Sequence, residues 1–462
     1  MRTERDTLGE VQVPDDALYG AQTQRAVENY PISGLRAHPV FIRSFILLKR
    51  AAALANRELG TLDAALSDAI ARACDRLLGD DEGNRKHFPV DVFQAGAGTS
   101  FNMNCNEVIA NLANVSLSGH LGEYKPIHPN DHVNMAQSTN DVFPTAIRIA
   151  TLLLLRELTT QLDALAAAFD DRGNAFADVI KSGRTHLQDA VPLTLGQEFR
   201  AYASATRRAT RLLTASAAEL RILGIGGTAV GTGMNAPRGY RQVVVRNLNA
   251  LTNLDLVPTD DLREAMQSQL PVSAVSGALR NLALELTRIT NDLRLLASGP
   301  QTGLAEITLP SVQPGSSIMP GKVNPSMLEC MNQVLFHIIG SATTIDYAVQ
   351  AGQLELNVMM PLMAFEILFS IEILKNYLPV FIEKCIRDIE ADRAQCEAYY
   401  ISSPSLATAL NPIIGYARAA EIAKESAKSG TPIPQLLREK KILSEDEIAR
   451  IFTPEFLAGQ AD

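Results

Sequence analysis

The sequence of 462 residues has no tryptophan, and its Phe and Tyr residues bring the aromatic content to only 5%. Hydrophobic residues still make up 46% of the chain, which is ample for a large core. Alanine and leucine are abundant among them. Because these two residues favour helices and aromatic residues favour strands, the composition predicts a mainly helical protein.

Cysteine is also scarce, and its spacing is wide. The five cysteines form no Cys-x-x-Cys pair, and their number is odd: Cys74, Cys105, Cys330, Cys385 and Cys396. This pattern argues against a disulfide framework and against a structural zinc site. We therefore expect reduced thiols in a cytoplasmic protein.

Long uncharged runs and an excess of basic residues are missing as well. The best candidate for a membrane span, residues 149–169, carries Arg156, Glu157 and Asp163, and the first ten residues are too polar for a signal peptide. The chain has 42 Lys and Arg against 51 Asp and Glu, a net charge of -9 at pH 7. Such a surface repels phosphate backbones, so nucleic-acid binding is disfavoured.

Apolar residues recur at helical spacing along most of the chain after the first forty residues, which read as loop and turn. Helical stretches are expected at about 40–78, 100–117, 141–175, 197–223, 274–298, 326–351 and 354–390, the last with a break near Pro361. Short helices are expected after residue 391, one of them with a capping box formed by Ser444 and Glu447. Long helices rich in Leu and Ala must bury their apolar faces, which predicts a bundle with further partners from neighbouring subunits.

Four segments place hydroxyl or amide side chains at expected junctions between a loop and a helix. A helix start exposes unpaired N–H groups and a partial positive charge, so hydroxyls there form a cradle for carboxylate or phosphate. One such cluster alone is better explained as helix capping. A cap needs only one hydroxyl, however, so the recurrence favours a shared binding site; the segments are 98–100, 138–140, 184–186 and 315–317.

The loop GSSIMPGKVNP, residues 315–325, is the most informative of these segments. Ser316 and Ser317 are adjacent, and Lys322 and Asn324 could grip one carboxylate. A serine held near a cation and backbone N–H groups becomes unusually acidic, although the same composition also fits a surface turn with a solvated lysine. His186 adds a group whose charge switches easily near neutral pH, but a lone histidine is more often structural or exposed.

A rival site would lie in the glycine-rich stretch GIGGTA, residues 224–229, which matches the loose G-x-G-x-x-A form of a nucleotide-dependent oxidoreductase. It follows a helical run rather than a strand, and no βαβ pattern surrounds it, so we interpret it as a turn between bundle helices. No HExxH or EF-hand pattern is present, and His128 and His132 lack further ligands at a suitable spacing. Neither a metal nor another cofactor is therefore expected.

Taken together, several segments resemble the aspartase/fumarase superfamily. GSSIMPGKVNP is close to the signature loop of that superfamily, and GAGTSFNMNCNEVIAN, HPNDHVNMAQSTND, GRTHLQDAVPLTLGQEF, NDLRLLASGP and GQLELNV match in order. The resemblance covers nearly the whole chain and implies an all-α, mainly helical fold. It implies an N-terminal lyase domain at 1–140, a central five-helix bundle at 141–390 with the signature loop at 313–325, and a small C-terminal helical domain at 391–462. The bundles are expected to assemble into a homotetramer with a helical core and active sites shared by three subunits.

The chemistry that the resemblance implies is a reversible anti elimination from a small dicarboxylate, which gives fumarate through an aci-carboxylate intermediate. Ser316 is the implied general base, and a serine serves as a base only when its oxyanion is stabilised. His186 and Lys322 are the other implied catalytic residues, and Glu329 is implied to polarise His186. The implied substrate-binding residues are Thr99, Ser100, Ser138, Thr139, Asn140, Thr185, Ser317 and Asn324.

Two motifs favour the aspartases over the class II fumarases. Fumarases typically read Gly-Ser-Gly-Thr-Gln where this chain has GAGTS at 96–100, and they often read Ser-Ser-Asn at 138–140. The expected reaction is the elimination of ammonia from L-aspartate, with L-malate, or another N-substituted or modified aspartate, as the alternative substrate. Met360, where aspartases usually have Glu, and the region around Pro271 depart from the family pattern. A non-catalytic helical scaffold is the remaining alternative, and the complete set of Ser316, Lys322 and Asn324 argues against it.

Overall fold

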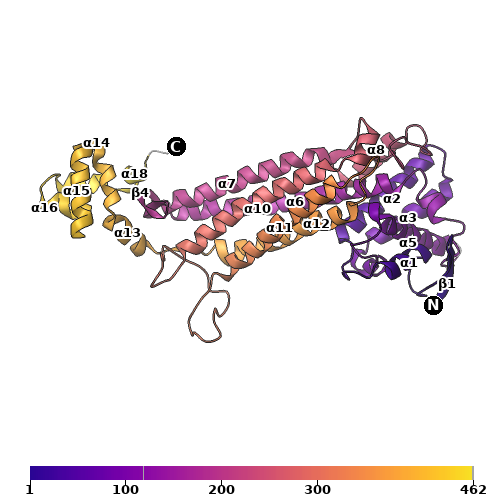
Figure 1. Ribbon diagram of the computed structural model, residues 1–462, viewed down its shortest axis with the longest axis horizontal. Coiled ribbons are helices and arrows are strands. Elements are labelled where there is room, and N and C mark those ends of the chain that lie inside the picture. The colour runs from indigo at the N-terminus through magenta and orange to yellow at the C-terminus, as the bar shows by residue number, and fades with distance from the viewer. Residues whose placement is uncertain (118, 460–462) are drawn as a thin grey trace. The chain divides into compact units, whose positions relative to one another are not determined.

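The computed structural model describes residues 1–117 and 119–459, with the side chains of residues 81 and 82 left aside, and it confirms the mainly helical fold class (Figure 1). The chain forms two compact units. The first contains residues 1–159, 211–281 and 337–374, and the second contains residues 160–210, 282–336 and the chain from 375 onward. Several long helices contribute residues to both units, and the three-domain division at 140 and 390 stays a prediction. None of the described helices is long and apolar enough to cross a membrane.

The first unit starts with a hairpin of β1 (Arg2–Asp6) and β2 (Gly9–Val13), and a helix follows at residues 21–29, so the first forty residues contain more regular structure than the predicted loop and turn. The periodicity over 40–78 predicts one helix, but the chain forms two, because it turns at Gly60 with a φ of 73° that favours glycine. Helices α2 and α3 pack on each other, α2 also contacts α8, and α5 contacts α1 and α3. The helices are α1 (Ala21–Asn29), α2 (Pro39–Glu58), α3 (Ala64–Leu78), α4 (Asp81–Asn84), α5 (Thr99–Leu117), α8 (Tyr240–Thr252) and α9 (Leu262–Gln267).

Helix α5 is buried on all sides over most of its length, although it carries five asparagines. These amides replace water as partners for the loops around the helix. Asn114 donates to the carbonyl of Ile127 at 2.8 Å and accepts from its N–H at 2.9 Å, and Asn104 donates to the carbonyl of His87 at 2.9 Å. The loops of the first unit are therefore tied to one central helix.

Glu107 on α5 provides the cap that α1 lacks in its own sequence. Its Oε2 accepts from the N–H groups of Gly20 and Thr23 at 2.9 and 3.1 Å and from the Thr23 hydroxyl at 2.6 Å, and its Oε1 accepts from Gln22 N–H at 2.9 Å. The N-cap residue Gly20 has no side chain to do this. A buried carboxylate thus compensates the unpaired N–H groups at a helix start.

The few aromatic residues gather where α2, α5 and α6 (Thr139–Ala175) meet. The rings of Phe41 and Phe45 on α2 pack against Phe101 on α5 and Phe143 on α6, with centroids 5.0 to 5.6 Å apart. Most of these pairs are edge-to-face, the arrangement that favours aromatic attraction. This cluster fixes the first turn of α5 beside the first turn of α6.

The second unit contains parts of five long helices that contact one another in turn: α6, α7 (Leu195–Ser216), α10 (Leu270–Leu296), α11 (Ser326–Gln350) and α12 (Met360–Phe381). Phe169 of α6 packs on Tyr202 of α7, with ring centroids 5.8 Å apart, and Arg288 of α10 lies over Tyr202. Asn332 of α11 donates to Asn291 of α10 at 2.9 Å. The hydroxyl of Tyr377 on α12 donates to the Met327 carbonyl of α11 at 2.9 Å, which completes a chain of helix contacts typical of a bundle.

The main correction to the sequence-based expectation is a hairpin in the segment interpreted as a loop before α7. Strand β3 (Ile180–Thr185) pairs antiparallel with β4 (Gln188–Thr194). The buried face of β3 includes Lys181, Ser182 and Gly183, so the strand has no alternation of apolar and polar residues. The period of two that identifies a half-buried strand is therefore missing from the sequence.

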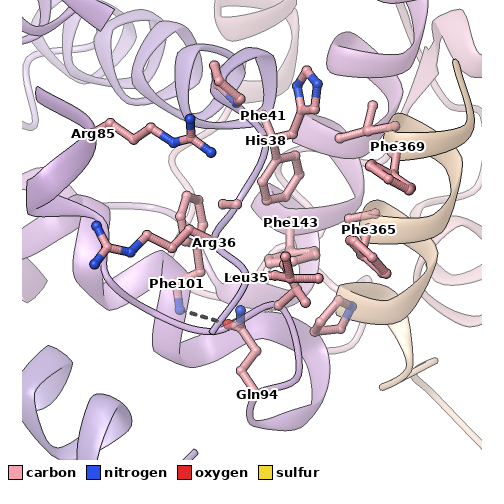
Figure 2. Close-up of a pocket in the computed structure, with 16 residues that line it drawn as sticks. Leu35, Arg36, His38, Phe41, Arg85, Gln94, Phe101, Phe143, Phe365 and Phe369 are labelled. Atoms are coloured by element: carbon pink, nitrogen blue, oxygen red, sulfur yellow. Dashed lines mark hydrogen bonds between the residues drawn. The ribbon is translucent and has the colours of Figure 1, made fainter. Parts of the chain in front are cut away.

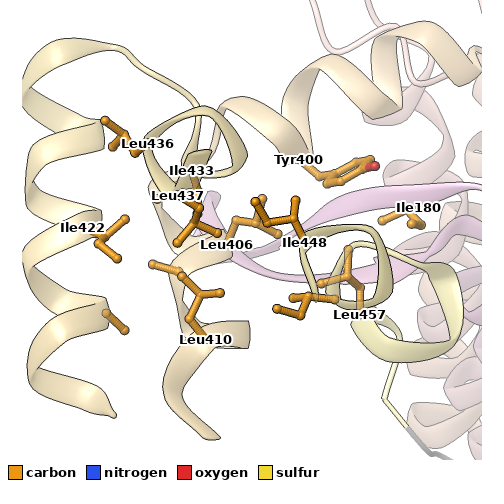
Figure 3. Packing of buried hydrophobic residues seen from close by; sticks show 13 residues of the cluster. Ile180, Tyr400, Leu406, Leu410, Ile422, Ile433, Leu436, Leu437, Ile448 and Leu457 are labelled. Carbon is orange, nitrogen blue, oxygen red and sulfur yellow. The ribbon is translucent and has the colours of Figure 1, made fainter. Parts of the chain in front are cut away.

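The chain after residue 391 forms short helices around an apolar cluster that also includes Ile180 of β3 (Figure 3). The expected capping box is confirmed, because the Ser444 hydroxyl accepts from Glu447 N–H and the Glu447 carboxylate accepts from Ser444 N–H at 2.8 Å. The helices are α13 (Arg393–Ser402), α14 (Asn411–Ile414), α15 (Tyr416–Ser429), α16 (Ile433–Glu439), α17 (Glu445–Ile451) and α18 (Pro454–Leu457). Two pairs of two-residue strands are also described: β5 (Ile222–Leu223) pairs with β6 (Val257–Pro258), and β7 (Ile307–Thr308) pairs with β8 (Glu390–Ala391). Isolated bridges join Arg36 to Asp91 and Gln353 to Leu356.

Replacing Glu107 with Gln should destabilise the protein by about 2–3 kcal/mol, because the new amide group would face N–H donors instead of accepting from them. The measurement is the free energy of unfolding in urea. Glu28→Gln is the matched control, since the exposed Glu28 accepts only from Gln24 within the described contacts. If Glu107→Gln lowers the free energy of unfolding by less than about 0.5 kcal/mol, as expected for the control, the capping role of Glu107 is contradicted.

Candidate active site

The predicted site residue Thr99 begins α5, as expected, and a strained turn precedes it. Ala97 has a φ of 59°, and its N–H donates to the Val358 carbonyl at 2.8 Å. Gly98 has a φ of 84°, and a Cβ there would lie 2.0 Å from the Phe143 ring. Only glycine therefore fits at position 98. The side chain of Thr99 is exposed, whereas that of Ser100 is buried.

Ser138, Thr139 and Asn140 lie at the start of α6, also as expected, and Asp141 holds them in place. The buried Asp141 carboxylate accepts from Ser138 N–H at 2.9 Å and from the N–H groups of Gly226 and Thr228 at 3.0 Å each. Burial raises the pKa of Asp141 to about 6, against the pull of these hydrogen bonds. The glycine-rich stretch thus binds a carboxylate of its own chain, which supports its interpretation as a structural turn.

A buried lysine that the sequence analysis missed lies behind Thr139. Lys49 is fully buried, and its Nζ donates to Asn102 at 2.8 Å and to Asn134 and Gln137 at 3.0 Å each. Asn102 in turn donates to the Thr139 hydroxyl at 3.1 Å. Burial lowers the pKa of Lys49 to about 7. The one signal in the sequence for a buried lysine is its place within the apolar run FILLKRAAALA. A lysine in a helix is usually interpreted as a surface residue, so this signal is easily missed.

Thr185 and His186 lie at the tip of the β3–β4 hairpin, not at a helix start as expected. His186 and Leu187 both have positive φ, 53° and 57°, which is the backbone of the tight turn that joins two antiparallel strands. Neither residue is glycine, so the turn holds strained backbone conformations. The side chains of the tip are exposed.

Ser316 and Ser317 lie in a loop without helix that we call the serine loop, residues 309–325. The Ser316 Oγ accepts from Ile318 N–H at 3.2 Å and from Met319 N–H at 3.0 Å. Asn324 donates to the Gly315 carbonyl at 2.6 Å, and Gly315 N–H donates to the Lys322 carbonyl at 2.9 Å. The expectation of a helix start is wrong here too, since α11 begins only at Ser326. Two N–H groups nevertheless point at the oxygen that would carry charge.

The serine loop encloses a concavity of about 430 Å³ lined by its own residues, which include Ser316 and Lys322. The expected partner of His186, Glu329, lies in the first turn of α11. Within the described ranges no hydrogen bond or ion pair joins His186 to Glu329. Thr99 and residues 138–140 belong to the first compact unit, whereas Thr185, His186 and the serine loop belong to the second.

A separate cavity of about 250 Å³ lies in the first unit near the phenylalanine cluster (Figure 2). Figure 2 shows Arg36 and Arg85 on one side and Phe365 and Phe369 on the other. None of the predicted site residues lines this cavity, and most of its wall is aromatic or aliphatic. A small dicarboxylate would lose its hydration there for few hydrogen bonds, so this cavity does not suit the expected substrate. The described side chains also contain no group of three His, Cys, Asp or Glu that could hold a metal ion.

Comparisons with known proteins identify the family to which this chain belongs. A family model described as "Lyase" matches residues 9–340, and one described as "Fumarase C C-terminus" matches residues 406–459. The chain belongs to the aspartase/fumarase family of lyases. It is 48% identical to the aspartate ammonia-lyase of Pseudomonas aeruginosa, over 98% of this chain and 96% of that one.

Two solved structures of similar proteins share the fold of this lyase. One is a fumarate lyase:delta crystallin from Brucella melitensis, with a TM-score of 0.95 and 47% identity, and the match covers 99% of both chains. The other is a class II fumarase from Schistosoma mansoni, with a TM-score of 0.94 and 34% identity over the whole of both chains. Both helical architecture and family membership are thus established along nearly the full chain.

The buried Lys49 should make the stability of this lyase depend on pH. Above pH 7, Lys49 is mostly deprotonated in the folded chain, whereas in the unfolded chain it stays protonated up to the usual lysine pKa of 10.5. Because the unfolded chain binds the additional proton, raising the pH favours folding. The unmodified protein should gain up to about 1.4 kcal/mol per pH unit relative to Lys49→Met between about pH 7 and 9. Urea unfolding at several pH values measures this slope.

The control for this slope is Lys86→Met, because the Lys86 side chain is exposed. Its pH dependence should match that of the unmodified protein. Equal slopes for Lys49→Met and the unmodified protein would show that Lys49 stays charged in the folded state.

Proposed function

We propose that this chain is an aspartate ammonia-lyase, which eliminates ammonia from L-aspartate and gives fumarate. The observation that carries the proposal is its 46–48% identity, over nearly the full length, to proteins that bear this name. Its identity to the class II fumarase is lower, at 34%. The residues at 96–100 and 138–140 support the same choice, because they depart from the fumarase pattern.

The proposed general base is Ser316, as an alkoxide that takes a proton from the substrate Cβ. An alkoxide in this position would accept hydrogen bonds from the N–H groups of Ile318 and Met319, which already point at Oγ at 3.2 and 3.0 Å. Hydrogen bonds to the charged form lower the pKa of an acid. The neighbouring Lys322 adds a positive charge on the same loop.

Loss of the Cβ proton places a second negative charge on the adjacent carboxylate, which becomes the aci-carboxylate. Donors aimed at that carboxylate lower the barrier, because the charge develops only in the transition state. We assign this role to Thr99, Ser138, Thr139 and Ser317, and we propose Ser100 as a further substrate-binding residue. Thr185, Lys322 and Asn324 would bind the other carboxylate, with Asn140 and His186 near the departing ammonia and Glu329 behind His186.

The assembly that we propose is a homotetramer whose active sites take residues from three subunits. Large apolar side chains stay exposed on the bundle helices, among them Leu284 on α10, Phe336 and Tyr347 on α11, and Phe369 on α12. Exposed apolar groups of this size on several helices are typical of subunit interfaces.

The free cysteines support a reducing compartment such as the cytoplasm for this reaction. All five cysteines are free, and four of them are buried. Burial raises the pKa of the Cys74 and Cys385 thiols to about 12, so these thiols stay protonated and unreactive.

Purified protein mixed with L-aspartate should produce fumarate, which is followed by its ultraviolet absorbance. L-malate is the matched substrate control, because it differs only in the leaving group. Fumarate from L-malate and none from L-aspartate would replace our proposal with fumarate hydratase, the alternative that the match to the fumarase C-terminal model favours.

Ser316→Ala is the matched variant for this assay. Removing the base should lower kcat by about a thousandfold while size-exclusion chromatography shows an unchanged assembly. Unchanged turnover would remove Ser316 from the mechanism. No turnover with either substrate, in a correctly assembled unmodified protein, would support the non-catalytic scaffold.

Mixing two inactive variants tests the composite site. Thr99→Val and Ser316→Ala should each lose most activity, but subunits exchanged between them should regain it. If the two residues come from different subunits, statistical mixing leaves roughly a quarter of the sites intact. Activity is measured before and after dissociation and reassembly of the equimolar mixture. No recovery, although mixed oligomers form, would indicate that one chain supplies both residues.

A further inference from the structure

Four charged side chains form a cluster in the second unit, between β3 and the segment that leads to the serine loop. Those of Glu306 and Lys181 are buried, and those of Arg184 and Glu198 are partly buried. The Glu306 carboxylate has no exposed surface and accepts from Arg184 Nη1 with both oxygens, at 3.0 and 2.9 Å. Lys181 Nζ lies 3.2 Å from Glu306 and donates to Glu198 of α7 at 3.0 Å. Two cations therefore lie against the fully buried Glu306 carboxylate, where removing one partner is costly.

On one side, this cluster holds the hairpin tip that carries Thr185 and His186. Arg184 directly precedes Thr185, and its guanidinium also lies over the Tyr399 ring, 5.4 Å from the centroid. The pairing of the strands shifts at Gly183, where a Cβ would meet the Val191 carbonyl at 2.4 Å. Because the tip itself is exposed and strained, the buried contacts of Arg184 determine where it stands.

On the other side, the same carboxylate fixes the chain that enters the serine loop. Glu306 N–H donates to the Leu296 carbonyl at 2.9 Å, and the Glu306 carbonyl accepts from Asp392 N–H at 3.0 Å. Residues 307 and 308 form β7, which pairs with β8, and the serine loop begins at the next residue. Glu306 is thus the last deeply buried charge before Ser316.

We infer that Glu306 is a positioning residue that couples the hairpin tip to the serine loop through its ion pair with Arg184. This inference rests on the proposed function for its kinetic consequence. The hairpin tip and the serine loop are both held by the buried Glu306. A displacement of the chain that enters the serine loop therefore also displaces Thr185 and His186, and a displacement of the hairpin tip also displaces the serine loop. A purely structural ion pair would instead stabilise the fold without linking the two segments.

The test compares Glu306→Gln, Arg184→Gln and the double variant with the unmodified full chain. Hydrogen exchange, read by mass spectrometry, should become faster both at residues 183–190 and at residues 309–325 in each single variant. The double variant should exchange no faster than the worse single variant, because the same link is cut. With L-aspartate, kcat/KM should fall by about tenfold to a hundredfold in the single variants, since small misplacements of reacting groups are costly.

Arg184→Lys provides a conservative comparison, and the Arg393–Asp178 pair provides a matched control. Lysine keeps a positive charge beside Glu306, so Arg184→Lys should retain more activity than Arg184→Gln. Arg393 pairs with Asp178 at 2.9 and 3.0 Å near the root of the same hairpin, but this pair is exposed. Arg393→Gln should leave kcat/KM and the exchange of the serine loop unchanged.

Faster exchange confined to the hairpin, or unchanged kinetics in folded Glu306→Gln and Arg184→Gln proteins, would overturn the inference. Should Glu306→Gln fail to fold, Arg184→Gln and Arg184→Lys give the same comparison without touching Glu306. An unmodified protein that does not turn over L-aspartate would contradict the proposed function alone, because the exchange measurement needs no substrate.

Discussion

Each buried charge in this fold must find a partner, and that constraint determines how the segments of the proposed active site are held. A site for a dianion needs donors in a place from which water can be excluded, so the side chains behind those donors are buried too. In the first unit, Lys49 meets this constraint with three amide oxygens. In the second unit, Glu306 meets it with Arg184 and Lys181.

The buried charges of the two units differ in the mobility of the backbone that they hold. Lys49, Asn102 and Asp141 lie under helix starts, whose backbone is rigid because the following turns are hydrogen-bonded. Glu306 instead lies at the root of a loop whose internal hydrogen bonds join residues of the loop itself, such as Asn324 to Gly315. In the mechanism that we propose, rigid helix starts suit groups that bind charge, and a loop suits a base that must approach the substrate after it has bound.

The glycine-rich stretch and the asparagines of α5 have roles that differ from those that the local sequence suggests. The glycine-rich stretch has the loose form of a nucleotide-binding loop, but its N–H groups bind Asp141 of the same chain. The asparagines of α5 would weaken an isolated helix, yet they pair with loop backbone that no water reaches. In both cases the partner is distant in sequence, so the local pattern could not reveal the role.

The sequence by itself determined the mainly helical class, the long helices, the capping box at Ser444 and the family, because these depend on local periodicity, local caps and ordered motifs. It also located Thr99 and Thr139 at helix starts. The β3–β4 hairpin, the break at Gly60, the buried Lys49 and the Arg184–Glu306 pair were decided only by the tertiary structure. Residues 184 and 306 are far apart along the chain, and each has an ordinary local context. Only the packing that buries Glu306 against Arg184 makes their charges depend on each other.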